Sequence, residues 1–172
     1  MKDNLARPEP LSDWDFEILK GIATYQFSSQ EVSDCLFPNK GDFLVQRSLT
    51  TGKIRNVLIK DGLRLYLVLR AQDFLFSLTL VSAMKLKECV KPPKLRVVVP
   101  SSISKFIKEG RNVFAKFVIG ADPDLRPNDE VLIVDEADNL LAIGKMKLSG
   151  EEVKHYKRGV AVHVKRGAED LD

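Results

Sequence analysis

The sequence predicts an α+β protein in two parts. In the first part, helix-spaced apolar residues precede strand-length segments separated by short turns, which favours a small antiparallel sheet with helices. In the second part, short segments follow one another in the order β-α-β-β-β-α-β, which favours a small closed or nearly closed β-barrel with short helices. The prolines of Lys91-Pro92-Pro93-Lys94 separate the two parts, because proline ends a helix and stiffens a linker. We therefore expect one domain over residues 12–91 and another over residues 94–167.

The first part is expected to begin with a loose polar arm over residues 1–11, followed by two helices. Ser12 or Asp13 can cap the first helix, and Ser28 or Ser29 can cap the second, which ends before Pro38. Three aromatic residues fall in this stretch, and their spacing is more typical of a core than of a base-stacking surface. They are Trp14, Tyr25 and Phe27.

A small sheet and a closing helix are expected next. The predicted strands are residues 43–48, 54–59, 63–69 and 74–80, and the helix covers residues 81–90. The first two strands flank a glycine-bearing turn and carry Arg47, Lys53 and Arg55. A basic hairpin is a weak signal for phosphate binding, and a solvated sheet edge is the alternative.

The second part is organised around the end of a helix. Ser101 or Ser102 can cap that helix, and its apolar face would comprise Ile103, Phe106 and Ile107. Gly110 falls where the residue after a helix adopts a left-handed backbone. Further strands are predicted over residues 95–99, 112–119, 130–134, 140–148 and 160–165. The spacing of Ser149 and Glu152 is that of a capping box for a short helix before the last strand.

Charge and composition restrict the class of protein. The net charge is +3, but residues 145–166 carry seven bases against two acids, and residues 122–138 carry seven acids against one base. Such a polarised domain would steer polyanions to one side. No apolar run approaches the roughly 20 residues that a membrane span requires, so we expect a cytoplasmic protein without a membrane partner. Cys35 and Cys89 lie far apart, and we expect two buried thiols rather than a zinc site.

The corner formed by Gly110, Arg111 and Asn112 is the first candidate site. Glycine lets a foreign backbone approach closely, and neighbouring Lys and Arg side chains suit a phosphate. A solvated helix end followed by an ordinary turn is the alternative interpretation of this stretch.

The second part resembles the PUA domain, named for pseudouridine synthases and archaeosine transglycosylases. The resemblance extends from Lys94 to about Arg166 and depends on four stretches taken together, residues 110–118, 122–131, 141–144 and 157–162. The first part is similar to the domain that precedes PUA in archaeal tRNA-guanine transglycosylases. There the similarity depends on Tyr25-Gln-Phe27, Thr51-Gly-Lys-Ile-Arg55 and residues 75–80.

This resemblance implies an RNA-binding protein with tRNA as its ligand and a role in archaeosine modification or other tRNA processing. In the family, RNA contacts come from the loop after the first PUA helix, the following strand and the final strand. The corresponding residues here are Lys105, Lys108, Gly110, Arg111, Asn112, Val113, Phe114, Lys116, Lys157, Arg158, Gly159, Lys165 and Arg166.

The family's catalytic barrel, with its aspartate nucleophile and cysteine-rich zinc site, has no counterpart in this sequence. No other motif has catalytic spacing, and the acids of residues 122–129 lack the ligand order of an EF-hand and suit turns. We therefore expect no catalytic residue, metal or cofactor. The alternatives are an essential RNA-binding subunit of a split transglycosylase, which would need a catalytic partner subunit, a PUA adaptor in translation or ribosome assembly, and a pure protein-interaction module.

Overall fold

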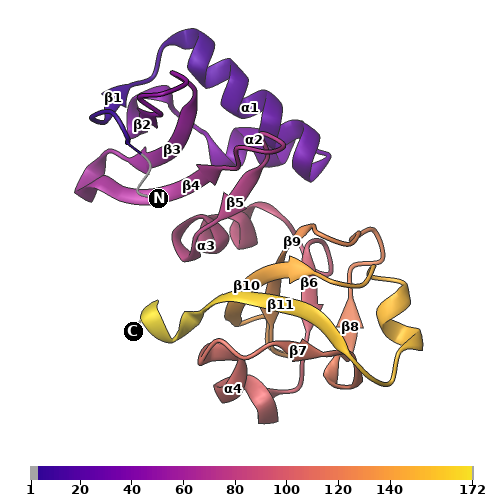
Figure 1. Cartoon of the computed structure of the whole chain (residues 1–172). Helices are drawn as coiled ribbons and strands as arrows, with labels where there is room; N and C mark the ends of the chain where they lie inside the picture. The colour runs from indigo at the N-terminus through magenta and orange to yellow at the C-terminus, as the bar shows by residue number, and fades with distance from the viewer. Residues whose placement is uncertain (1–3, 172) are drawn as a thin grey trace. The chain divides into compact units, whose positions relative to one another are not determined.

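A computed structural model describes residues 4–171 and divides the chain into two compact units, Met1–Cys89 and Val90–Asp172 (Figure 1). The first unit contains a five-stranded sheet in the order β1-β2-β3-β4-β5. The second contains a six-stranded sheet in the order β7-β11-β10-β9-β6-β8. The α+β class predicted from the sequence is therefore confirmed. The division falls just before Pro92, where the sequence places the linker.

The first unit packs three helices against its antiparallel sheet. The helices contact one another in sequence and reach the sheet at its β4 and β5 side. In chain order the elements are β1 (Glu9–Pro10), α1 (Asp13–Phe27), α2 (Gln30–Leu36), β2 (Phe43–Arg47), β3 (Ile54–Ile59), β4 (Arg64–Leu69), β5 (Phe76–Leu78) and α3 (Leu80–Cys89).

Helix α1 begins with a reciprocal capping box. The Asp15 backbone N–H donates to Ser12 Oγ, and the Ser12 backbone N–H donates to Asp15 Oδ2, both at 3.0 Å. These bonds satisfy two of the free N–H groups that every helix start leaves. Leu19, Ala23 and Phe27 then face the core, and the helix begins after Ser12, one of the two caps predicted from the sequence.

An aromatic cluster fills the space between the helices and the sheet. The rings of Phe37, Phe43 and Tyr66 lie with centroids 5.3–6.0 Å apart, and Phe76 completes the group. Tyr66 Oη donates a hydrogen bond of 2.9 Å to the Leu36 carbonyl oxygen. Burial raises the pKa of Tyr66 above its usual value, so this phenol remains a hydrogen-bond donor at any physiological pH.

Two expectations for the first unit are wrong. The described part of the N-terminal arm is not loose, because β1 pairs with β2, Leu5 bridges Ser48, and the Ala6 N–H donates to the Arg47 carbonyl. Of the three aromatic residues assigned to the core, only Phe27 is buried, whereas Trp14 is 73% exposed and Tyr25 is 79% exposed. Helical spacing reveals that residues share a face, but not whether that face meets the core or solvent.

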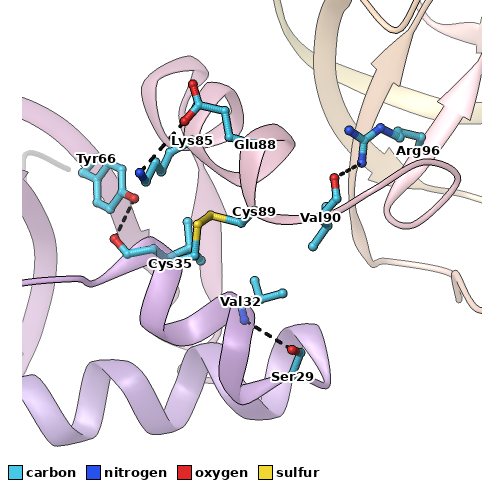
Figure 2. Close-up of a disulfide and its surroundings, with 10 residues drawn as sticks. Ser29, Val32, Cys35, Tyr66, Lys85, Glu88, Cys89, Val90 and Arg96 are labelled. Atoms are coloured by element: carbon cyan, nitrogen blue, oxygen red, sulfur yellow. Dashed lines mark hydrogen bonds and ion pairs between the residues drawn. A yellow bond between two sulfur atoms is a disulfide. The ribbon is translucent and has the colours of Figure 1, made fainter.

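The expectation of two free thiols is also wrong. Cys35 on α2 and Cys89 at the end of α3 form a disulfide with a Cα–Cα distance of 5.7 Å (Figure 2). The packing of α2 against α3 brings together two cysteines that are 54 residues apart in sequence. The bond fixes the end of α3 immediately before the chain enters the second unit.

The strands of the second unit form one curled sheet. All its strand pairs are antiparallel except β6 with β9. Its elements are β6 (Arg96–Val98), α4 (Ser104–Lys108), β7 (Val113–Phe114), β8 (Gly120–Ala121), β9 (Glu130–Val134), β10 (Leu140–Met146) and β11 (Val160–Gly167), with 3-10 helices at Ser101–Ile103, Ala115–Phe117, Glu152–His155 and Ala168–Leu171.

The strand predicted over residues 112–119 is divided. A 3-10 helix at Ala115–Phe117 separates β7 from β8, and these two strands lie at opposite edges of the sheet. A short connection between the two edges requires the sheet to curl round, which produces the barrel form expected for this part. The preceding helix is also shorter than its apolar spacing indicates, because its first turn is a 3-10 helix.

The buried side chain of Arg96 binds the backbone of the linker, residues 90–94, to the second unit. Its guanidinium, 1% exposed, donates to both Asp138 carboxylate oxygens at 2.9 and 3.1 Å. It also donates to the carbonyl oxygen of Val90 at 2.9 Å (Figure 2) and to that of Lys94 at 3.0 Å. A buried guanidinium needs several acceptors, and here the linker backbone supplies two of them.

We expect the disulfide to stabilise the first unit by about 4 kcal/mol, because it closes a loop of 54 residues in the unfolded chain. The paired variant Cys35→Ser/Cys89→Ser should unfold at lower guanidinium concentration than the oxidised protein. Adding a phosphine reductant should lower the midpoint of the native protein and leave that of the variant unchanged. Equal midpoints for the oxidised and reduced native protein would contradict this assignment.

Asp15 is expected to make the first unit sensitive to acid. Burial would raise the pKa of its carboxyl, but hydrogen bonds from Arg47 and Ser12 outweigh burial and hold the pKa below 3.8. The stabilisation is therefore fully present above about pH 4 and is lost as the pH falls through the lowered folded-state pKa. Asp15→Asn should cost roughly 2 kcal/mol at pH 7 and less at pH 2, as measured by urea unfolding. The same loss at both pH values would contradict the role assigned to the charge.

Candidate nucleic-acid interface

The end of helix α4 forms a Schellman motif. The Gly110 N–H donates to the Ile107 carbonyl at 2.9 Å, and the Arg111 N–H donates to the Phe106 carbonyl at 3.1 Å. Gly110 has a φ of 98°, a backbone conformation that favours glycine. The Arg111 guanidinium lies over the Phe106 ring, 5.2 Å from its centroid. The corner predicted from the sequence is thus a rigid turn that presents a cation beside an aromatic ring.

Strand pairing brings the two predicted segments together. Phe114 on β7 pairs with Val160 on β11, and the Ala115 N–H donates to the Gly159 carbonyl at 2.9 Å. Because the strands are antiparallel, Lys116 lies at the same end of the pair as Gly159 and the bases before it. At the other end of this strand pair, the α4 corner lies against the last residues of β11. The predicted residues therefore follow one edge of the sheet, which we call the β7–β11 edge.

The predicted site residues differ in their exposure along this edge. Lys108 and Asn112 are half-buried, and Val113 is fully buried, so Val113 presents no side chain to a ligand. The remaining ten are exposed: Lys105, Gly110, Arg111, Phe114, Lys116, Lys157, Arg158, Gly159, Lys165 and Arg166.

Asn112 and Gly167 hold the α4 corner against β11. Asn112 Oδ1 accepts a hydrogen bond of 3.0 Å from the Val164 N–H. A Cβ at Gly167 would lie 1.8 Å from the Lys108 carbonyl oxygen, so only glycine permits this approach. Asn112 therefore has a positioning role on this edge. Gly167 was not identified from the sequence, because the contact that requires glycine is made by a residue distant in the chain.

Three exposed aromatic side chains accompany the bases. Phe114 is 45% exposed on β7, Phe106 is 47% exposed below Arg111, and Tyr156 is 50% exposed next to Lys157. Phe106 belongs to the predicted apolar face of the helix, but of the three residues of that face Ile107 is the buried one. Aromatic rings interspersed with Lys and Arg form the combination that binds single-stranded nucleic acid by stacking and phosphate contacts.

Among residues 4–171, Arg111, Lys116, Lys157 and Arg158 form no salt bridge with an acidic side chain. Lys116 lies over the Phe117 ring, 4.9 Å from the centroid. Cations without a carboxylate partner keep their charge available for a phosphate.

The acidic block has structural roles. Asp122 is buried and accepts hydrogen bonds from the N–H groups of Leu95 and Asp124. Asp138 holds the buried Arg96. The Asp135 carboxyl loses water by burial, but hydrogen bonds from Asn139 and Ala137 outweigh that effect and lower its pKa. These acids therefore build turns and anchor the linker, and Asp124 remains as an exposed acid in this block.

The basic hairpin of the first unit is a poorer candidate. Arg47 Nε donates to Glu9 Oε1 at 2.6 Å, and Arg47 Nη2 donates to both carboxylate oxygens of Asp15 at 2.7 Å. Lys53 lies over the Phe74 ring at 4.8 Å. Arg47 of this hairpin is therefore already paired with carboxylates of its own unit.

The part of the chain that the structure describes contains no group of three or more His, Cys, Asp and Glu side chains able to hold a metal ion. Within the same residues, none of the helices has the length and apolar character needed to cross a bilayer.

The two units match two domain families. Residues 95–168 match the PUA domain, and residues 17–93 match the patch-forming domain C2 of tRNA-guanine transglycosylase. The class of protein is therefore a PUA-domain protein with an α+β domain before the PUA domain, and the resemblance stated from the sequence is confirmed.

The chain is similar in sequence to archaeal tRNA-guanine(15) transglycosylases. It is 40% identical over 153 residues to the tRNA-guanine(15) transglycosylase of Methanobrevibacter smithii and 42% identical over 149 residues to that of Methanocaldococcus jannaschii. The matches cover 89% and 87% of this chain, but the chain spans only 22% of each enzyme. The chain is thus homologous to the C-terminal region of archaeal tRNA-guanine(15) transglycosylases.

A solved structure matches both domains of this chain along most of its length. A hypothetical protein of Pyrococcus horikoshii OT3 superimposes with a TM-score of 0.72 and 26% identity, covering 95% of this chain and 96% of that one. The combination of the two folds therefore also occurs in a chain of similar size.

The β7–β11 edge is expected to bind RNA through phosphates. Each contact releases counterions, so log affinity should fall with log salt by roughly 0.7–0.9 per contact. Replacing Arg111 and Lys116 together with Ala should flatten that slope by about one to two units in tRNA titrations followed by fluorescence anisotropy. Folding should survive, because exposed substitutions cost within about 0.5 kcal/mol.

Asp124→Asn is the matched control for this experiment, since Asp124 is an exposed acid of the same unit. It should leave the slope unchanged. Asp138 is unsuitable, because its removal would leave the buried Arg96 without this carboxylate. An unchanged slope in the Arg111/Lys116 variant would exclude this edge as the site.

Proposed function

We propose that this protein is a non-catalytic RNA-binding protein that recognises tRNA and serves the archaeosine modification of tRNA. The observation that carries the proposal is the β7–β11 edge of the PUA domain, where exposed aromatic rings lie beside exposed cations. Four of these cations form no salt bridge with an acidic side chain among residues 4–171, namely Arg111, Lys116, Lys157 and Arg158. The domain before it belongs to a family defined by tRNA-guanine transglycosylases. Of the RNA classes, this association favours tRNA over ribosomal RNA.

The residues of the edge have separate roles in this proposal. Arg111 contacts phosphates at the α4 end of the edge, and Lys116, Lys157 and Arg158 contact them at the opposite end, where β11 begins. Phe114 lies between the two groups of cations and stacks on an unpaired base or a ribose. Asn112 and Gly167 contribute indirectly, because they keep the α4 corner and β11 in register. A preformed edge loses little conformational entropy on binding.

A second candidate function is supported by the relatives. In these relatives the matched region makes up 22% of the enzyme chain, so the rest of the enzyme lies outside the region that this chain matches. The same two domains can thus act as the RNA-binding portion of a transglycosylase whose catalytic portion lies on another chain. In that case the protein delivers tRNA to the catalytic portion and still performs no chemistry itself.

Sequencing the RNA that co-purifies with the protein tests the first proposal. We expect tRNA to be enriched over ribosomal RNA, and the Arg111/Lys116 variant should recover less of it. Enrichment of ribosomal RNA would support an adaptor in translation or ribosome assembly, and the absence of any salt-dependent RNA binding would support a protein-interaction module.

The purified chain is expected to incorporate no labelled guanine into tRNA by itself. The reason is chemical: the sequence supplies neither the family's zinc cysteines nor its nucleophile barrel, and both cysteines form the Cys35–Cys89 disulfide. Incorporation that appears only after addition of a transglycosylase catalytic chain would favour the second candidate. Incorporation by the chain alone would refute both.

A further inference from the structure

Helix α1 has an exposed apolar face that the first unit does not use. Trp14 is 73% exposed, Ile18 37% and Tyr25 79%, and Gly21 between them is also exposed. These four positions are separated by four, three and four residues, so they form a narrow stripe along one side of the helix. This spacing is that of a seam along which a second helix packs. We call this stripe the α1 face.

Gly21 is unexplained by the fold of the chain itself. A Cβ at this position would meet no atom within 4 Å, and Gly21 lies within the helix rather than at its end. Glycine inside a helix is unfavourable relative to alanine, and nothing within the unit compensates for that here. A partner could approach the helix backbone closely between Ile18 and Tyr25 only if position 21 carries no side chain, which explains a glycine there.

The charges around the α1 face oppose nucleic acid. Residues 13–34 carry five acids and the base Lys20. Three of the acids are in ion pairs, Asp13 with Lys40, Asp15 with Arg47 and Asp34 with Lys20, so Glu17 and Glu31 supply the negative charge of this border. Lys20 is paired with Asp34 at 2.7 Å, and Glu17 and Glu31 are exposed beside the helix pair. An acidic border repels phosphate and attracts Lys and Arg side chains. The exposed tryptophan and tyrosine therefore suit a protein surface better than a stacked base.

We propose that the α1 face binds the catalytic portion of a tRNA-guanine transglycosylase. The partner's contact surface would be an apolar helix bordered by Lys and Arg side chains. This proposal rests on the second candidate function above, and it assigns the docking surface to the first unit and the RNA-binding edge to the second. Trp14 and Tyr25 are the anchoring side chains, since tryptophan and tyrosine dominate the affinity of protein interfaces. Gly21 lets the two backbones approach.

The probe is the Methanobrevibacter smithii tRNA-guanine(15) transglycosylase truncated to remove the region that this chain matches, with its folding verified by circular dichroism. We expect saturable binding in calorimetry. Trp14→Ala and Tyr25→Ala should each weaken it by about 30-fold, the loss typical of an interface hot spot. Leu49→Ala is the matched control, because Leu49 is 65% exposed in the same unit but lies on the β2–β3 turn. It should leave the affinity unchanged.

Gly21→Ala distinguishes docking from a loss of folding. In the isolated protein this change should raise the melting temperature of the first unit by roughly 4–8 °C, because alanine favours a helix more than glycine does. The same variant should weaken binding to the truncated transglycosylase. A more stable protein that binds less well cannot be explained by misfolding.

Several results would overturn the assignment. They are the absence of saturable binding between the two folded proteins, an equal affinity for the Trp14→Ala and Leu49→Ala variants, and self-association that only Trp14→Ala abolishes, which would indicate a second copy of this chain. A loss of tRNA affinity in Trp14→Ala would identify a stacking surface instead. If tRNA does not bind but the transglycosylase does, the RNA-binding proposal fails while the docking surface remains.

Discussion

Strand β11 determines the architecture of the second unit. It pairs with β10 on one side and β7 on the other, and its last residue, Gly167, contacts the end of α4. The Gly167 backbone lies so close to the Lys108 carbonyl that no other residue type fits. This contact places the α4 corner beside a strand that begins some fifty residues later in the chain. The candidate site on the β7–β11 edge depends on this placement.

The first unit achieves rigidity by different means. Its aromatic cluster and the Tyr66 hydrogen bond hold the helices on the sheet, and the Cys35–Cys89 disulfide ties α2 to α3. Domains of this size bury a smaller fraction of their surface than large ones, so a covalent link contributes substantially. The linker is held at its other end by Arg96, which bonds the carbonyls of Val90 and Lys94. Both ends of the connection are thereby anchored in their own units.

The surfaces of the two units differ in chemistry. The β7–β11 edge combines cations with aromatic rings, whereas the α1 face combines aromatic rings with acids. Stacking groups alone do not distinguish a base from a protein side chain, because both present an apolar face. The charge beside the ring decides which partner is attracted. On this basis we propose separate partners for the two units, RNA for the second and protein for the first.

Much of this could be predicted from the sequence, because it depends on neighbouring residues. The α+β class, the positions of most strands, the Ser12 and Ser149 caps and the glycine corner after α4 are local properties of hydrophobic period and turn chemistry. Contacts between distant residues decided the rest. The disulfide, the division of the strand over residues 112–119 and the exposure of Trp14 and Tyr25 depend on which faces the folded chain covers. Periodicity records that residues share a face, and only the tertiary structure determines what that face meets.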